Sequence, residues 1–288
     1  MHVKRARSAG FCFGVSLALR ALNKELLARD GKKQTDGARL LMFGPIIHNP
    51  LVMRLYAAKG VGCEENPAHL RPGDRIVIRA HGIPKELEAE LRDKKAVLID
   101  ATCPKVKRAQ LSIEKACAMG NTLLLLGERE HPEVKGLLSY AGSEALVFGN
   151  LEELKDFRLN PAVPYVLAAQ TTQERTLFLA AKKILEKRLL KEVPVLETIC
   201  DATRKRQDEV ISLTREVDAF VVVGGKNSAN TGRLAEVARA HGIRTVHVED
   251  AEEFSPDMLA GARVVGLTAG ASTPEEHIDA MHRILEGL

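Results

Sequence analysis

The chain has 288 residues, of which 45% are hydrophobic and 28% charged, a composition typical of a globular protein with a sizeable buried core. Its net charge of +4 is small and only 4% of the residues are aromatic, which argues against a nucleic-acid-binding protein. The apolar stretch near the N-terminus is interrupted by Gly14, Arg20 and Lys24, so we expect a helix there rather than a secretory signal. No apolar run is long enough to span a bilayer. Five cysteines without an export signal predict a cytoplasmic protein with reduced thiols.

Three cysteines share one local setting, each between a short apolar run and a helical pattern. They are Cys12, Cys103 and Cys200, separated by 91 and 97 residues. The preceding strands are expected at 2–6, 96–99 and 193–196, and the following helices at 15–27, 105–119 and 202–216. Each cysteine is therefore predicted at the carboxyl end of a strand, where parallel α/β sheets bind ligands.

Further features recur in the same order after each cysteine. A second apolar run ends in a glycine turn, at Gly44, Gly127 and Gly224. A third strand is expected at 61–63, 145–148 and 245–248, and a fourth ends in a polar turn at His81, Thr171 and Ser272. These agreements predict a threefold repeat of one α/β unit.

The repeat predicts an α/β protein of three similar parallel-sheet domains. We expect them at residues 1–94, 95–191 and 192–288, with right-handed crossovers between the strands. A unit of this size is only marginally stable alone. Three units packed around a common axis would bring their strand ends together and form one shared central site.

The spacing of the three cysteines indicates one shared metal centre rather than a local zinc knuckle, which needs a Cys-x-x-Cys pair that this chain lacks. Three thiolates are one short of the usual four, so a [4Fe–4S] cluster held by them would keep one iron open for a substrate. Cys117 lies about 21 Å along the helix from Cys103, and Cys63 ends a different strand, so neither is expected as a fourth ligand. The alternative is that the cysteines are buried packing residues.

The other turns carry groups suited to an anion. His48 and His81 each follow a strand, and the turns at 225–231 and 269–274 offer hydroxyl, amide and backbone N–H groups at helix starts. Oriented N–H groups at a helix N-terminus suit a phosphate. Each turn alone is a weak signal, but together they suggest a diphosphate-sized anion.

The sequence His131-Pro132-Glu133 predicts a helix start. Proline is favoured at the first helical position, which makes His131 the cap and puts Glu133 in the first turn. Such a pair could relay protons, but on this motif alone a structural capping histidine and a dipole-pairing glutamate are the favoured interpretation. The hydroxyl of Thr171 could orient the carboxylate, but threonine is also a common cap.

In order along nearly the whole chain, these turns resemble those of the 4-hydroxy-3-methylbut-2-enyl diphosphate reductase family. The resemblance is carried by eight motifs, at residues 9–15, 44–49, 80–82, 100–104, 131–134, 170–172, 226–228 and 268–272. It implies a trefoil of three α/β domains around a central [4Fe–4S] cluster with Cys12, Cys103 and Cys200 as its ligands.

The resemblance also implies the remaining site residues. The diphosphate contacts would be His48, His81, Ser228, Asn230 and Ser272, with His131 at the diphosphate end of the substrate. Glu133 and Thr171 would handle the substrate hydroxyl and the proton supply. Where some members of the family carry a second serine, this chain has Ala229, which leaves only a backbone N–H at that position.

The implied reaction is reductive removal of the substrate hydroxyl, which gives isopentenyl and dimethylallyl diphosphate for isoprenoid synthesis. Electrons would come from reduced ferredoxin or flavodoxin. Two alternatives are a metal-dependent, zinc-containing hydrolase of phosphate esters and a non-catalytic module that binds a phosphorylated metabolite. A brown iron–sulfur protein would exclude the first, and metal-free protein that binds equally well without its cysteines would favour the second.

Overall fold

The computed structural model describes residues 1–31, 37–142 and 144–288. Its strands form three parallel sheets, which confirms the expected α/β class with small parallel sheets. The residues fall into two compact units. Unit 1 consists of Met1–Ser16, Ile47–Leu55 and Asp201–Leu288, and unit 2 consists of Leu17–Ile46 and Tyr56–Cys200.

Unit 1 is built on one sheet, here sheet A, with helices on both faces. Its strand order is β1 (His2–Arg5), β11 (Val264–Ala269), β9 (Ala219–Val223) and β10 (Arg244–Val248). Alternate residues of β9 enter two separate cores, one with α10 (Glu275–Glu286) and the other with α8 (Asp201–Leu213) and α9 (Ala229–Ala240). Because both faces are covered, β9 is apolar throughout, as expected for a buried parallel strand.

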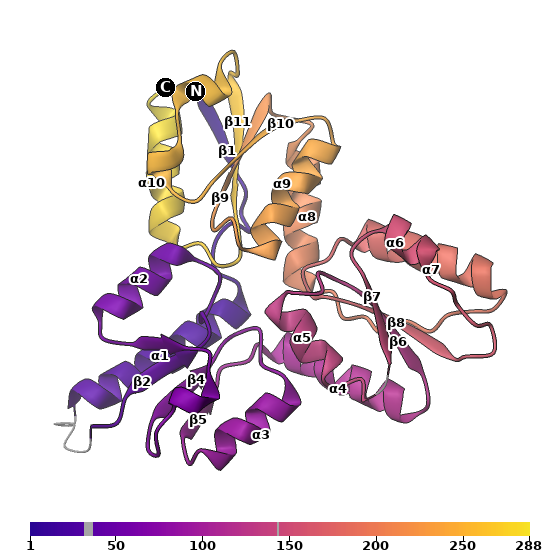
Figure 1. Ribbon diagram of the computed structural model, residues 1–288. Helices are drawn as coiled ribbons and strands as arrows, with labels where there is room; N and C mark the ends of the chain where they lie inside the picture. Colours follow the sequence, from indigo (N-terminus) through magenta and orange to yellow (C-terminus); the bar gives the residue numbers. More distant parts are fainter. Residues whose placement is uncertain (32–36, 143) are drawn as a thin grey trace. The chain divides into compact units, whose positions relative to one another are not determined.

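The two ends of the chain meet in unit 1. β1 pairs with β11 in parallel, with Val3 opposite Val265, and α10 packs beside β1. The ammonium of Met1 donates a hydrogen bond to the carbonyl of Leu285 at 3.3 Å, and the labels N and C lie side by side in Figure 1. The first strand of the chain is thus an edge strand of the sheet formed by its last third.

Unit 2 contains two sheets. Sheet B has the order β3 (Gly62–Glu64), β2 (Leu40–Phe43), β4 (Arg75–Ile78) and β5 (Val97–Asp100), and α3 (Lys85–Asp93) contributes Leu91 to its core. Sheet C has the order β7 (Ala145–Phe148), β6 (Thr122–Leu126) and β8 (Tyr165–Ala169). One face of sheet C is covered by α6 (Leu151–Asp156) and α7 (Arg175–Leu189), and the other by α4 (Pro104–Ala118) and α5 (Pro132–Leu138). The helices α1 (Phe13–Gly31) and α2 (Pro50–Ala58) each begin in unit 1 and end in unit 2.

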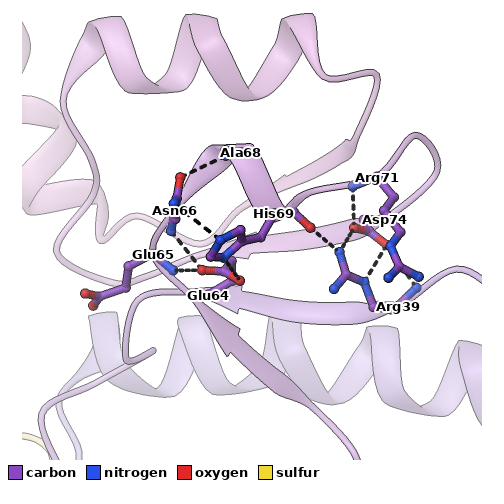
Figure 2. Close-up of polar contacts among 8 residues, drawn as sticks. All are labelled: Arg39, Glu64, Glu65, Asn66, Ala68, His69, Arg71 and Asp74. Carbon is purple, nitrogen blue, oxygen red and sulfur yellow. Dashed lines mark hydrogen bonds and ion pairs between the residues drawn. The ribbon is translucent and has the colours of Figure 1, made fainter.

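The connection between β3 and β4 is held by buried and partly buried carboxylates (Figure 2). A short 3₁₀ helix, η1 (Pro67–His69), lies in this connection. Asp74 accepts hydrogen bonds from Nε of Arg39 at 3.2 Å, Nη2 of Arg39 at 2.6 Å and the backbone N–H of Arg71 at 2.8 Å. The carboxylate of Glu64 lies 3.0 Å from Nδ1 of His69. These contacts fix the entry into β4, which leads to the His81 turn.

The predicted strands are confirmed except for the run at 193–196. That run forms only an isolated bridge between Val195 and Leu167 of β8. Pro194 has no N–H to donate, so the ladder is limited to its carbonyl, which accepts from Leu167 at 2.9 Å, and to the N–H of Leu196. The hydroxyl of Thr198 completes the ladder by bonding both backbone groups of Ala169.

β5 and the Val195 run each pair within the sheet of the preceding third, and β1 pairs within the sheet of the last third. β1 joins sheet A with β9–β11, β5 joins sheet B, and the run through Val195 joins sheet C. The expected domain boundaries at 94/95 and 191/192 remain a prediction. The hydrogen bonding nevertheless groups β5 and the Val195 run with the residues that precede them, so sheet boundaries fall closer to the cysteines than the repeat suggests.

Candidate active site

Each of the three cysteines is bound through its backbone to a polar turn. The N–H of Cys12 donates to the carbonyl of Ala271 at 3.2 Å, that of Cys103 to Ala80 at 2.9 Å, and that of Cys200 to Thr171 at 2.9 Å. The acceptors lie in the turns that carry Ser272, His81 and Thr171. The same contact therefore recurs three times, each time because the strand before the cysteine is the parallel neighbour of the strand that ends in the polar turn.

The turn that carries Cys12 is held by the helix α8. The guanidinium of Arg206, which is buried, donates to the carbonyl of Gly10 at 2.7 Å. Glu209 accepts from the N–H of Arg7 at 2.7 Å, the N–H of Ser8 at 2.9 Å and the hydroxyl of Ser8. Burial opposes ionisation of Glu209, but these donors keep the pKa of its carboxyl below the ordinary value. Two side chains of α8 thus fix residues 7–10, which lead into Cys12, within unit 1.

Cys103 and Cys200 each directly precede a helix. Cys103 is the N-cap of α4, with Pro104 at the first helical position, and the N–H of Thr102 donates to Asp100 at 2.9 Å. Cys200 immediately precedes Asp201, the first residue of α8. Within unit 1, the sulfur of Cys12 accepts from the N–H of Val15 at 3.4 Å. All three cysteines thus lie at or directly before the start of a helix.

The chemistry of the five cysteines fits a metal centre at three of them. None of the five forms a disulfide with a described residue, and Cys12, Cys103 and Cys200 are neither fully buried nor fully exposed. Cys117 lies inside α4, where burial raises the pKa of its thiol and disfavours the thiolate that a metal needs. Cys63 lies on the edge strand β3. The donor set of three thiols in equivalent turns suits an iron–sulfur centre and leaves Cys63 and Cys117 outside it.

Glu133 and Thr171 form a buried pair in unit 2. One carboxylate oxygen of Glu133 accepts from the N–H of Thr171 at 2.6 Å and the other from its hydroxyl at 2.9 Å. Burial raises the pKa of Glu133 to about 7; the two donors of Thr171 oppose this shift, and the charge of Glu128 adds to it. Glu133 is therefore poised to hold and release a proton near neutral pH.

His131 is the N-cap of α5, as its sequence predicts. Its Nδ1 accepts from the N–H of Glu133 at 3.1 Å, with Pro132 at the first helical position. A neutral ring that accepts at Nδ1 carries its proton on Nε2 and can donate from there. The ring lies edge-to-face against that of His81, with centroids 5.5 Å apart. The structure thus brings His81, His131 and Glu133 into one cluster with Thr171.

The turn that carries His81 depends on a close backbone approach. Gly82 has φ +71°, and a Cβ there would lie 2.9 Å from Nε2 of the buried Gln110. The side chain of Arg79 donates to the carbonyl of Gly82 at 3.3 Å, and the N–H of Gly82 donates back to the carbonyl of Arg79 at 2.9 Å. A glycine is required here because any side chain would be strained and would displace Gln110.

The anion-binding turns predicted for 225–231 and 269–274 adjoin one another in unit 1. Ser228 is the N-cap of α9, with Ala229 and Asn230 in its first turn, and Ser228 and Asn230 are buried. Among the described residues, Nδ2 of Asn230 has no hydrogen-bond partner. A buried amide donor without an acceptor is costly, so it calls for an incoming acceptor at the positive end of this helix.

Ser272 links its turn to His48. Its hydroxyl donates to the carbonyl of His48 at 3.1 Å, and its own carbonyl accepts from Nδ2 of Asn49 at 2.9 Å. A Cβ on Gly225 would lie 2.8 Å from the same His48 carbonyl. Lys226, by contrast, is exposed and pairs with Glu253 at 2.8 Å. Unit 1 therefore gathers His48, Ser228, Asn230 and Ser272 at the carboxyl end of sheet A.

Several residues that position the site were missed by sequence reasoning. Arg206, Glu209 and Thr198 contact residues that are far away in sequence, and no local pattern indicates such partners. Arg79 contacts Gly82, three residues further along the chain, but its side chain gives no sign of that role in the sequence. The only sequence signal is the spacing of Arg206 and Glu209, which places both on one face of α8. Among the described residues, no helix is long and apolar enough to cross a bilayer.

Comparison with known proteins finds matches over nearly the whole chain. The model of the family described as LytB protein matches residues 3–286. The chain is 57% identical to 4-hydroxy-3-methylbut-2-enyl diphosphate reductase of Nitratidesulfovibrio vulgaris strain DP4, with 100% of both chains covered. It is 41% identical to the protein of the same name from Geobacter sulfurreducens, covering 99% of this chain and 98% of that one.

Two solved structures share the fold. One is the E-1-hydroxy-2-methyl-but-2-enyl-4-diphosphate reductase of Plasmodium falciparum, with a TM-score of 0.91 and 22% identity over 99% of this chain and 87% of that one. The other is a structure of (E)-4-hydroxy-3-methyl-but-2-enyl diphosphate reductase, the terminal enzyme of the non-mevalonate pathway. It has a TM-score of 0.68 and 35% identity, with 100% of both chains covered.

Proposed function

Because the chain belongs to the LytB protein family, we propose that it reduces (E)-4-hydroxy-3-methylbut-2-enyl diphosphate to isopentenyl and dimethylallyl diphosphate. In this reaction the allylic C–O bond breaks and a C–H bond forms. Two electrons and two protons are consumed and one water is released. The full-length similarity to reductases favours this reaction over the zinc hydrolase and the binding module considered from the sequence.

The observation that carries the proposal is the threefold contact between a cysteine and a polar turn. We propose that Cys12, Cys103 and Cys200 hold the iron–sulfur cluster that the family implies, because all three lie in equivalent turns and none forms a disulfide with a described residue. When bound, a [4Fe–4S] cluster with three cysteine ligands supplies one-electron transfer and an iron without a protein ligand. The chain contributes three turns that are each fixed by backbone hydrogen bonds, so each turn by itself needs little local reordering to offer its thiol.

The diphosphate is expected to bind through side chains from the polar and glycine turns. Ser228, Ala229 and Asn230 lie at the N-terminus of α9, whose dipole and N–H groups favour an anion. The Nδ2 group of Asn230 offers a donor, and Ala229 contributes a backbone N–H only. Hydrogen bonds from His48, His81 and Ser272 would complete the contacts. These groups hold the substrate in one geometry, which is where a large share of the rate enhancement should arise.

Glu133 is the proposed proton source. Its pKa of about 7 keeps a large fraction protonated at neutral pH, and the two donors of Thr171 fix the orientation of the carboxyl. His131, protonated on Nε2 when neutral, would donate a hydrogen bond to the substrate beside it. Thr171 would exchange its hydroxyl proton between the carboxyl and the substrate hydroxyl.

The electrons must arrive one at a time from outside the chain. A reduced ferredoxin or flavodoxin is the donor that we propose, and the cytoplasmic location remains a prediction from the sequence. The family membership supports a small diphosphate substrate but does not identify the donor.

The proposal is tested by anaerobic purification, a visible spectrum and a reductase assay. We expect a brown protein that converts the hydroxylated diphosphate to the two isoprenoid diphosphates when dithionite-reduced methyl viologen supplies electrons. Colourless protein that hydrolyses the diphosphate would overturn the reductase. Binding of the diphosphate without turnover by cluster-loaded protein would also contradict it.

A further inference from the structure

The outer face of α4 is a basic and apolar surface next to Cys103. Val106, Ala109, Gln110 and Ile113 point into the core, and the opposite side of the helix is exposed. On that side lies a shallow hollow of about 600 Å³. Its lining, here called the α4 surface, is Thr102, Pro104, Lys107, Arg108, Leu111, Ser112 and Lys115.

The charges of the α4 surface are incompletely neutralised by the protein. Arg108 and Lys115 are exposed, and neither forms an ion pair with a described residue. The ammonium of Lys107 lies 3.8 Å from both Glu88 and Asp100 and 6.0 Å from the centroid of the Tyr140 ring. Leu111, between the basic residues, is 52% exposed. A surface with unpaired arginine and lysine around an exposed leucine is suited to contact with an acidic protein.

The α4 surface begins at the proposed ligand Cys103. Because Cys103 is the N-cap of α4, Arg108 lies five residues further on and Lys115 twelve. At a rise of 1.5 Å per residue, Arg108 and Lys115 lie about 7.5 Å and 18 Å from Cys103 along the helix axis. A protein docked on this surface would therefore bring its own redox group close to Cys103, a proposed ligand of the cluster that the protein must reduce.

We propose that the α4 surface is the docking site of an acidic one-electron carrier protein, an inference that rests on the proposed reductase function. The reaction needs two electrons, so a carrier must bind, deliver one electron, leave and be replaced. Such electron-transfer encounters use small interfaces, and a small charged patch is sufficient for them. Charge attraction speeds the encounter without making the complex long-lived, which suits a partner that must leave after each electron.

The test compares two donors in the loaded enzyme. Kinetics are measured with a reduced acidic [2Fe–2S] ferredoxin and with dithionite-reduced methyl viologen, a small cation that needs no docking surface. For the charge reversal R108E/K115E we expect KM for ferredoxin to rise about tenfold at low salt, while turnover with methyl viologen stays within about twofold. The wild-type rate with ferredoxin should fall with added salt, and that of the variant should change much less.

A matched control is available on α7. Lys183 and Lys187 are exposed and form no ion pair with a described residue, and Lys187, like Lys115, lies in the last turn of its helix. The variant K183E/K187E therefore changes the net charge by the same amount, in the second half of a helix that does not begin at a cysteine. It should retain the wild-type KM for ferredoxin. An equal rise in KM in both variants would show that the effect comes from the net charge of the protein, and it would overturn the docking site.

Direct binding separates this inference from the proposed function. The affinity of oxidised ferredoxin for the loaded wild-type protein and for R108E/K115E is measured without turnover. Equal affinity overturns the docking site whatever the activity. Weaker binding by R108E/K115E in a protein that does not reduce the diphosphate would retain the docking site and reject the reductase. Binding of DNA or of a second copy of the chain, in place of ferredoxin, would assign the surface to a different partner.

Discussion

Glu133 is the residue whose environment most directly determines reactivity. Its carboxyl is buried at the start of α5, and both of its oxygens accept from Thr171. Burial favours the neutral acid, so the pKa rises to about 7 and the proton is lost only as the pH passes through that value. Turnover that depends on this proton must therefore decrease as the pH increases above about 7.

We predict that Glu133→Gln retains substrate affinity and loses most turnover. The amide fits the site, because its oxygen can accept from the N–H of Thr171 and its NH₂ can donate to the hydroxyl. It cannot supply a proton, so kcat should fall by about 10²-fold or more, and the decrease above pH 7 should disappear. The measurement is kcat and KM from pH 5.5 to 9 with methyl viologen as the donor.

Variants at Thr171 provide the control. Thr171→Val removes the hydroxyl donor that lowers the pKa of Glu133, so the decrease in kcat should move to higher pH. Thr171→Ser retains the donor and should keep the wild-type profile. A Glu133→Gln variant that still shows the decrease near pH 7 would assign it to another group.

Much of the arrangement at this scale could be predicted from the sequence. The order His131-Pro132-Glu133 predicts a cap, a first helical residue and a first-turn carboxylate, and all three are confirmed. The contact of Thr171 with Glu133 was expected only as a possibility, because the sequence separates them by a helix and two strands. Arg206 and Glu209, which hold the Cys12 turn, could not be predicted, since nothing in α8 indicates its partner.

At the scale of elements, the turns are shaped by backbone approaches that leave no room for a side chain. Gly225 follows β9, and a Cβ there would lie 2.8 Å from the carbonyl of His48, closer than such atoms approach. The turn that leads to Ser228 and the turn that carries His48 are thus packed backbone against backbone.

We predict that Gly225→Ala destabilises the protein by about 1–3 kcal/mol and raises KM for the substrate more than it lowers kcat. The added methyl must displace the His48 backbone in unit 1, whereas the carboxyl of Glu133 is held by Thr171 within unit 2. Stability is measured by urea unfolding under anaerobic conditions, and KM by the methyl viologen assay.

Gly232, in the second turn of α9, is the matched control. A Cβ there would have no atom within 4 Å, and the residue is helical. Gly232→Ala should stabilise the protein by about 0.5–1 kcal/mol, because alanine loses less conformational entropy in a helix. If Gly225→Ala were as harmless as Gly232→Ala, the close approach to His48 would not restrict that turn.

The elements were largely predictable, but their partners were not. An apolar run of four to six residues indicates a buried strand, and β2, β6, β9 and β11 were found where expected. The pattern does not indicate which strand lies beside it, so β5 was assigned to the residues that follow it rather than to β4. Pro194 shows the limit most clearly, since its run is apolar enough for a strand but Pro194 itself has no N–H to donate, so only an isolated bridge forms.

At the scale of the whole molecule, the three proposed ligands come from three different sheet edges. We predict that Cys12→Ser, Cys103→Ser and Cys200→Ser each reduce the iron content from about four atoms per chain to near zero, because a cluster with two thiolates is poorly held. Iron and sulfide are assayed after anaerobic purification, with the visible spectrum as an independent measurement.

The two remaining cysteines are the controls. Cys63→Ser and Cys117→Ser should retain iron, colour and reductase activity, because Cys63 lies in strand β3 and Cys117 inside helix α4, outside the three cysteine turns. Loss of iron in Cys63→Ser with retention in Cys12→Ser would reject the assignment of ligands.

The pairing of β1 with β11 has a consequence for biosynthesis. β1 leaves the ribosome first, but its neighbour in sheet A is translated only when nearly the whole chain exists. The strands of sheets B and C all lie between Leu40 and Ala169 and can associate while translation continues. Cys12 is therefore the first of the three proposed ligands to be made and the last whose turn is fixed, because Ala271, which accepts from its N–H, is translated after Cys103 and Cys200 and their partners.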